Sequence, residues 1–183
     1  MEEHMSITGG KVILRAAKRP DLGMLLNLSR DPEIVKVTKG YQSLSAGMHP
    51  AYRSCLLPVP SDGLRRIIAA REKPEEGLGI IMLSDIDTGN KTAQIQIKIL
   101  RMFRGRGYGR DAVETLVSWA FRELHLNCIC SHILEDNTAS RRLFEVCGFR
   151  QEGLHEGRTD AEGHCRKVCV YVRREVTSSC KML

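Results

Sequence analysis

The chain has 183 residues, of which 42% are apolar and 27% charged, an ordinary composition for a folded globular protein. Its net charge of +6 suits an anionic ligand, but aromatic residues are sparse at 5% and no long basic block occurs, which argues against a nucleic-acid partner. No apolar run reaches membrane-spanning length, and no secretory leader is apparent. We expect one domain without a membrane partner, with loose tails at 1–9 and 177–183.

Seven cysteines, an odd number, occur without any Cys-x-x-Cys pair. Several fall on apolar strand positions, where cysteine behaves as a small hydrophobe. This usage is typical of reduced thiols in the cytoplasm. Cys128, Cys130 and His132 alternate along one strand and would share a face, but no fourth ligand is indicated, so we expect no metal.

The N-terminal third combines short regular elements with one long irregular segment. Residues 38–60 are rich in Gly, Ser and Pro, and a segment of this kind in a compact domain is often a lid or binding loop. We place substrate recognition there, with a short helix within 50–57. The elements expected before it are a strand over Val12–Ala17, a helix over Leu22–Leu28 entered at Pro20-Asp21, and a turn or helix from Asp31-Pro32 through Val37 with Asp31 as N-cap.

Three consecutive strands are predicted next, at Leu64–Ala70, Leu78–Leu83 and Gln94–Leu100. The connections at 73–77 and 87–90 are short, so the strands should form an antiparallel meander. In the third strand, isoleucines alternate with Gln and Lys, which indicates one apolar face.

A glycine- and arginine-rich loop, Arg-Gly-Arg-Gly-Tyr-Gly-Arg at 104–110, joins this strand to a long helix. The alternate glycines let the backbone curl against a ligand, and the first helical turn offers unpaired N–H groups at the positive end of the helix dipole. Such a junction binds phosphate or pyrophosphate. Neither a Rossmann nor a P-loop spacing fits, because Arg110 stands where the third Rossmann glycine belongs and no Gly-Lys-Ser/Thr run exists. The helix is predicted from an apolar stripe of Val113, Leu116, Val117, Ala120, Phe121 and Leu124.

The C-terminal part is predicted to contribute a buried strand, a helix and a hairpin. Because a helix precedes it, the strand Cys128–Leu134 should run parallel to Gln94–Leu100. Either Asp136 or Asn137 caps the next helix, and Gly148 ends it. The remaining expectations are an apolar helix side of Ala139, Leu143, Val146 and Cys147, a strand from Phe149, a turn near 160–163, and a last strand over Cys165–Val172.

Taken together, these motifs resemble the GNAT N-acetyltransferase superfamily. Its acyl-CoA signature is Arg/Gln-x-x-Gly-x-Gly/Ala, which Arg104, Gly107 and Gly109 match, and the later Asn-x-x-Ser and Gly-Phe-x-x-Glu-Gly patterns are most similar to the ribosomal-protein N-terminal and polyamine acetyltransferase branch. The resemblance spans about 12–175. It implies an α/β fold with a mixed, mostly antiparallel sheet flanked by helices, in which two parallel strands splay apart to hold acyl-CoA.

The resemblance also implies where the co-substrate, acetyl-CoA, would lie. The pyrophosphate would rest on the amides of 105–110, and the pantetheine would pair with the backbone of Ile97 and Ile99. Asn137 and Ser140 would face the cofactor, although Asn137 could be a helix cap alone and Ser140 a solvated residue. The expected cofactor residues are Ile97, Ile99, Arg104, Gly105, Arg106, Gly107, Tyr108, Gly109, Arg110, Asn137, Ser140 and Arg142.

The implied reaction needs a base for the amine, an oxyanion donor and a fate for the leaving thiolate. Relatives often carry a glutamate five residues before the asparagine, where this chain has His132; Glu135 is the second candidate base. Gln94 occupies a second common carboxylate position, and Phe144 replaces the tyrosine that many relatives use as the acid. Water or Ser140 would have to serve instead, and a backbone N–H near Ile99 would be the oxyanion donor.

The leading hypothesis is an acetyl-CoA-dependent N-acetyltransferase acting on an amine of a small molecule or on a protein N-terminus. The alternative is an acyl-CoA-binding sensor or partner module with little turnover, which the residues at 94 and 144 motivate. A homodimer is common among similar proteins, and the sequence does not decide the oligomeric state.

Overall fold

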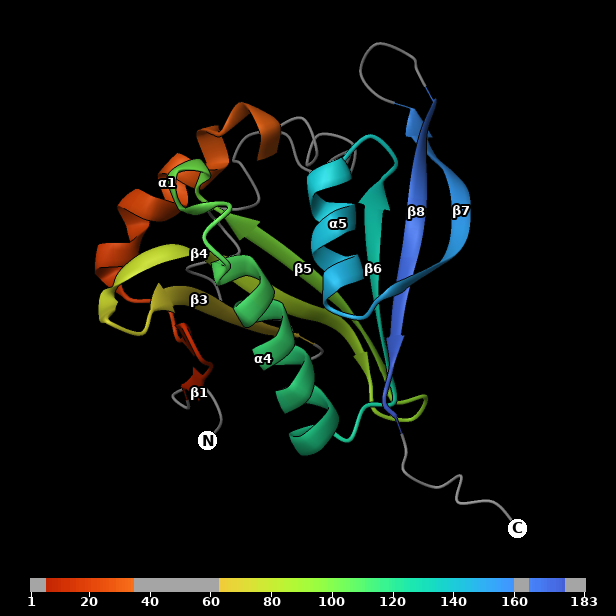
Figure 1. Cartoon of the computed structure of the whole chain (residues 1–183), viewed down its shortest axis with the longest axis horizontal. Helices are drawn as coiled ribbons and strands as arrows, with labels where there is room; N and C mark the ends of the chain where they lie inside the picture. Colours follow the sequence, from red (N-terminus) through yellow and green to blue (C-terminus); the bar gives the residue numbers. More distant parts are fainter. Residues whose placement is uncertain (1–5, 35–62, 160–164, 177–183) are drawn as a thin grey trace.

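The structure, a computed structural model, describes residues 6–34, 63–159 and 165–176. These residues fold around one sheet with the strand order β1-β2-β3-β4-β5-β6-β8-β7 (Figure 1). All neighbouring strands are antiparallel except β5 and β6, which are parallel. The predicted mixed, mostly antiparallel sheet is therefore confirmed. The strands are β1 Ile7–Thr8, β2 Val12–Arg15, β3 Leu64–Ala70, β4 Lys73–Asp87, β5 Thr92–Ile99, β6 Cys128–Leu134, β7 Arg150–Thr159 and β8 Cys165–Arg174.

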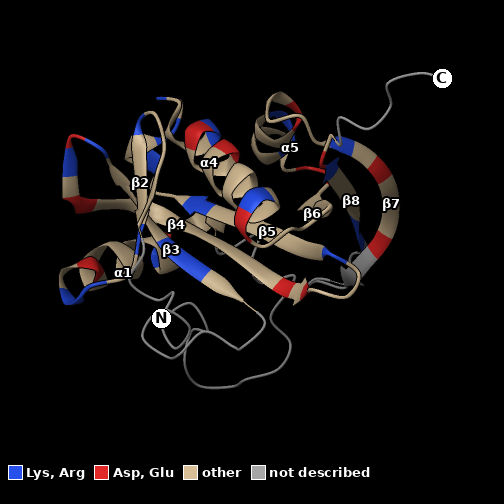
Figure 2. Ribbon diagram, turned by 90° about the horizontal axis from the view of Figure 1, so that it is seen from below, with Lys and Arg blue, Asp and Glu red and all other residues tan. Residues whose placement is uncertain are grey.

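Helices cover both faces of the sheet. Figure 2 shows α4 (Tyr108–Glu123) and α5 (Thr138–Val146) on one side and α1 (Leu22–Arg30) on the other. Short 3₁₀ turns precede α1 and follow β5, at Arg19–Asp21 and Arg101–Phe103. The main core lies between the sheet and the α4/α5 layer, and a smaller one lies under α1.

The predicted stripe of α4 is the face that packs on the sheet. Val113, Leu116, Val117 and Ala120 are fully buried, while Phe121 packs at the margin of the same core. In α5 the predicted apolar side is only partly right. Leu143 and Cys147 pack on the core, but Ala139 and Val146 are exposed, and the core-facing aromatic residue is Phe144.

Several element boundaries also differ from the prediction. Ile7 and Thr8 pair with β2 as strand β1, so the predicted N-terminal tail is shorter than expected. β2 ends at Arg15. β4 begins at Lys73 and continues through a bulged register against β3, so the turn is at 71–72 rather than 73–77. The predicted lid at 38–60 and the turn at 160–163 lie outside the described residues.

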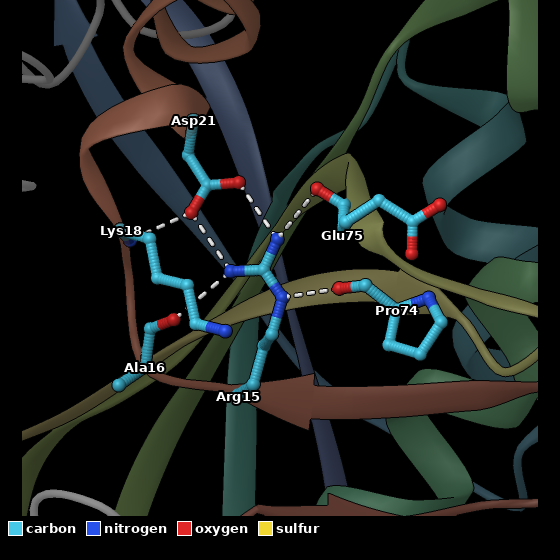
Figure 3. Close-up of polar contacts among 6 residues, drawn as sticks. All are labelled: Arg15, Ala16, Lys18, Asp21, Pro74 and Glu75. Atoms are coloured by element: carbon cyan, nitrogen blue, oxygen red, sulfur yellow. Dashed lines mark hydrogen bonds and ion pairs between the residues drawn. The ribbon is translucent and has the colours of Figure 1, made fainter.

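A buried ion pair holds the entrance of α1 against the β3–β4 hairpin. The Arg15 guanidinium donates two hydrogen bonds of 2.8 Å to the Asp21 carboxylate, and both side chains are almost fully buried (Figure 3). Arg15 also donates to the carbonyls of Ala16, Pro74 and Glu75, and Asp21 accepts from the Lys18 N–H. Every strong donor of the guanidinium therefore has an acceptor, as a buried charge requires.

A second carboxylate fastens the β1–β2 turn to the start of α4. Asp111 accepts hydrogen bonds from the backbone N–H groups of Gly10, Lys11 and Val12, at 3.2, 2.7 and 2.9 Å. A Cβ on Gly9 would lie 2.3 Å from Thr115 Oγ1, so the turn passes directly over this helix. The first turn of α4 is thus fixed from outside as well as by its own core contacts.

Candidate active site

A cleft opens where the two parallel strands part. β5 and β6 are paired only from Thr92–Gln94 to Cys128–Cys130, and beyond these residues they diverge. The resulting cavity has a volume of about 510 Å³. It is lined by Glu33, Ile34, Gln94, Gln96, Ile97, Lys98, Ile99, Arg104, Gly105, Gly107, Gly109, Arg110, Ser131, His132, Ile133, Leu134, Asn137, Ala139, Ser140, Leu143 and Phe144.

The cleft is lined from both faces of the sheet. Ile97 and Ile99 pack with the core under α4 and α5, whereas Gln96 and Lys98 alternate with them and point to the face that carries α1. On β6, Ile133 faces the helices and His132 faces the opposite side. The cavity therefore joins the two faces through the gap between the strands.

The glycine loop forms the end of the cleft beside α4. Gly105 and Gly107 have φ values of +73° and +85°, the left-handed region that side chains rarely adopt. Gly107 is the N-cap of α4, so the unpaired amides of the first turn follow it directly. The loop therefore presents backbone N–H groups and the helix dipole to the cavity, as predicted for an anion site.

The arginines of the loop have different contacts. Arg104 donates to the Ile99 carbonyl at 2.9 Å and pairs with Asp31 at 2.7 Å and with Glu33, so it ties the loop to the segment after α1. Arg110 lines the cleft and pairs with Glu114. Arg106 lies outside the lining, with its guanidinium 5.9 Å from the Phe103 ring centroid.

Of the remaining expected cofactor residues, some line the cleft and others lie outside it. Asn137 caps α5, accepting from the Ser140 N–H at 3.1 Å, and both residues also line the cleft. Tyr108 packs against the main core, and Arg142 is exposed away from the lining. The structure thus brings nine of the twelve predicted residues to one cavity, all except Arg106, Tyr108 and Arg142.

A histidine stands across the base of the opening. His132 Nδ1 lies 3.1 Å from Gln94 Oε1. This contact links β6 to β5 beside the point where the two strands part. In the tautomer in which Nδ1 donates to this amide oxygen, Nε2 carries the ring lone pair that a general base uses.

The surroundings of His132 favour its neutral form. Desolvation by the cleft is the largest cause that lowers the pKa of His132, and positive charge on His155 lowers it further, while Asp85 acts in the opposite direction. At neutral pH these effects favour an uncharged ring. Glu135, the second candidate base, is exposed and does not line the cleft.

No phenol lines the described cleft. Phe144 is 1% exposed and packs edge-to-face on Phe149 at 4.9 Å. The buried Tyr171 hydroxyl donates to Glu145 at 2.7 Å and accepts from Arg141, so it is held outside the cavity. The hydroxyls of the lining are Ser131 and Ser140.

Sequence reasoning missed several lining residues. Ser131, Ile133 and Leu134 follow from the predicted strand once its parting from β5 is known, since both faces then meet the cavity. Glu33 and Ile34 belong to the predicted helical turn, but nothing in the sequence places that turn beside the cleft. Among the described residues, no group of three His, Cys, Asp or Glu side chains is placed to hold a metal ion. No helix in the described ranges is long and apolar enough to cross a bilayer.

Comparisons with known proteins agree with this geometry. Residues 11–150 match the family model of the acetyltransferase (GNAT) domain. The chain is 26% identical over 145 residues to spermidine N(1)-acetyltransferase of Vibrio cholerae serotype O1, covering 78% of this chain and 81% of that protein. It is 33% identical over 109 residues to the putative ribosomal N-acetyltransferase YdaF of Bacillus subtilis, covering 56% and 57%.

The fold is shared with solved acetyltransferases. The crystal structure of spermidine N-acetyltransferase from Vibrio cholerae in complex with CoA and spermine superposes with a TM-score of 0.73 at 22% identity, covering 90% of this chain and 95% of that one. A glycine loop at the start of α4, parallel strands that part beside it, and a family match over most of the chain all agree: this protein is a member of the GNAT family of N-acetyltransferases.

Proposed function

We propose that this protein transfers the acetyl group of acetyl-CoA to an amine by direct attack in a ternary complex, within the cleft between β5 and β6. The observation that carries the proposal is that one cavity joins the glycine loop on the helical face to His132 on the opposite face. Cofactor and acceptor would then enter from opposite faces and meet in the gap between the strands.

Backbone geometry supports the placement of the cofactor. The Leu100 N–H is bonded to Leu78 on the β4 side, so by alternation the N–H groups of Ile97 and Ile99 point into the gap towards β6. The Ile99 carbonyl is taken by Arg104, which fixes this end of β5. The pantetheine would pair with these amides, the pyrophosphate would rest on the loop at 105–110, and one of the two amides would hold the developing oxyanion.

Proton transfer would involve His132. Nε2 takes a proton from the acceptor ammonium directly or through water, and the neutral amine then attacks the thioester carbonyl carbon. A C–N bond forms, the C–S bond breaks, the thiolate leaves with the electron pair, and the newly acylated nitrogen releases its second proton to solvent. Protonation of the thiolate by solvent or by a lining serine completes the reaction, since no phenol lines the described cleft.

The charge of the lining bears on the acceptor. Among the described lining residues one is a carboxylate, Glu33, and three are cationic: Lys98, Arg104, which pairs with Glu33, and Arg110, which pairs with Glu114 of α4. A polycation gains little from such a lining. We therefore expect a peptide N-terminus or a monoamine to be a better acceptor than spermidine, although a relative is named for spermidine.

Steady-state release of CoA thiol tests the proposal, with a panel of peptides, monoamines and polyamines. We expect turnover on at least one amine, and His132→Gln should reduce kcat/KM by about 10²–10⁴-fold without loss of acetyl-CoA binding. His125→Gln is the matched control, because His125 is exposed just beyond α4 and lies outside the cleft lining. Tight acetyl-CoA binding with no turnover on any amine would instead support a binding module.

A further inference from the structure

A second histidine lies on the same face of the sheet as His132. His132 on β6, Val170 on β8 and Gly153 on β7 are register partners and form one row across three neighbouring strands. His155 follows Gly153 by two residues without a bulge between them, so its side chain leaves β7 on this same face. This is the face opposite α4 and α5, to which His132 and Gln94 also point.

The absence of a side chain at Gly153 makes room for the His155 ring. A Cβ at Gly153 would lie 3.3 Å from His155 Nε2 and 3.4 Å from Val170 Cβ. The imidazole therefore leans back along β7 over Gly153, into the row that ends at His132. Any larger residue at 153 would displace the ring from this position.

Several polar and charged groups of the described strands share the face that carries His132. β8 presents Val168, Val170 and Val172 there, with Arg166 and Arg174 at the two ends of the row, where they pair with Asp136 and Glu152. The neighbouring strands add Ser84 and Asp85 on β4, Gln94, Gln96 and Lys98 on β5, Cys128 and Cys130 on β6 and His155 on β7. Asp85 and His155 act in opposite directions on the pKa of His132, and desolvation adds to the effect of His155.

We propose that His155 is a positioning residue for the transfer reaction. Positive charge on His155 disfavours a second positive charge on His132 and so keeps His132 in its neutral, proton-accepting form. The inference rests on the proposed function for its catalytic meaning. When the acceptor ammonium gives its proton to His132 Nε2, one N–H bond breaks and one forms, and His132 becomes cationic. Whenever His155 is itself protonated, its charge favours release of that proton to solvent, which resets the base for the next turnover.

The direct test is an NMR titration of the His132 ring, assigned by its loss in His132→Gln. We expect His155→Gln to raise the pKa of His132, because the substitution removes a like charge that lies across one intervening residue. His155→Lys, which keeps a positive charge, should restore the wild-type value. The difference should shrink in high salt, because exposed charges are screened.

Activity provides the second readout. The acid limb of the pH profile of kcat/KM should move to higher pH in His155→Gln, by as much as the pKa of His132 rises, and should return to its wild-type position in His155→Lys. His125→Gln should leave both the NMR titration and the pH profile unchanged. An unaltered His132 titration in His155→Gln, or a shift that lysine fails to reverse, would overturn the inference. Failure of every amine as a substrate would remove the proposed function instead, and the NMR titration would still decide whether His155 acts on His132.

Discussion

Gly109 provides a steric test of the cofactor cleft. It lies in the first turn of α4, where a Cβ would be 3.2 Å from Ile99 Cδ1 and 3.5 and 3.6 Å from the two Leu143 methyl groups. Its φ lies outside the left-handed region, so a substitution there does not strain the backbone as it would at Gly107. Gly109, Ile99 and Leu143 all line the cavity. The methyl group of an alanine fits between Ile99 and Leu143 after a small movement, but the two additional methyl groups of a valine do not.

The expected sizes follow from these distances. Gly109→Ala gains about 0.5–1 kcal/mol of helix propensity, offset in part by the contact with Ile99, and should bind acetyl-CoA nearly as the wild type does. The extra methyl groups of Gly109→Val would have to share the gap with the pantetheine, and overpacking of this kind costs about 1–3 kcal/mol. That cost corresponds to a loss of about 5- to 150-fold in affinity.

Calorimetric titration with acetyl-CoA measures the affinity, and urea denaturation measures the stability of the same variants. Gly23 in α1 supplies the matched controls, since a Cβ there meets nothing within 4 Å. Gly23→Ala and Gly23→Val should change stability through helix propensity alone and leave affinity unchanged. A folded Gly109→Val that binds as tightly as the wild type would refute the placement of the cofactor between Ile99 and Leu143.

Four further substitutions test contacts around the site. Asp21→Asn should lower the free energy of unfolding in urea by about 3–5 kcal/mol, because the Arg15 charge stays buried without its anion. Asp111→Asn leaves one acceptor oxygen for three backbone donors and should cost about 2–4 kcal/mol in the same assay. Arg104→Gln should change acetyl-CoA affinity less than Arg110→Gln, because Arg104 is held by two carboxylates, Asp31 and Glu33, and Arg110 only by the exposed pair with Glu114; Arg110→Gln should weaken binding about 3- to 10-fold and more at low salt. Gln94→Glu places an anion beside the imidazole and should raise the pKa of His132, moving the acid limb of kcat/KM to higher pH.

The opposite result at each of these positions would contradict the contact on which the expectation rests. Glu123→Gln, an exposed change on α4, is the control for the two carboxylates and should cost less than about 0.5 kcal/mol. Costs as small as this at Asp21 or Asp111 would show that their hydrogen bonds add little. A larger loss of cofactor affinity at Arg104 than at Arg110 would mean that Arg104 exchanges its carboxylates for phosphate. A lower His132 pKa in Gln94→Glu would contradict the contact between these two side chains.

Elements with a strong apolar period were predicted well, because their period is a local property. The bounds of β3 and β6 are those expected, and the stripe of α4 faces the sheet as predicted. β1 was missed because two residues carry no period and exist as a strand only through pairing with β2. The start of β4 was missed because Pro74 and the charged residues beside it resemble a loop, and a bulge keeps them in register.

Contacts between distant residues were beyond the reach of the sequence. Nothing near Arg15 in the chain indicates that its charge is neutralised inside the fold. Likewise, nothing near Asp111 indicates that it holds a turn about a hundred residues away. The apolar side of α5 failed for a related reason. The period allowed Val146 to face inward, but the packing of Phe144 on Phe149 sets the rotation of the helix and leaves Val146 59% exposed.

The two ends of the cleft differ in how far the sequence determines them. The proposed pyrophosphate site would act through backbone amides of the glycine loop, and the residues that permit its conformation are contiguous at 105–109, so a local motif was enough to predict it. The proposed acceptor end would act through side chains that come from separate strands. His132 is a candidate base whose Nδ1 lies 3.1 Å from Gln94 Oε1, a contact created by the pairing of β5 with β6. Since that face depends on pairing rather than on a local motif, exchanging a side chain there can alter acceptor chemistry while the cofactor site stays intact.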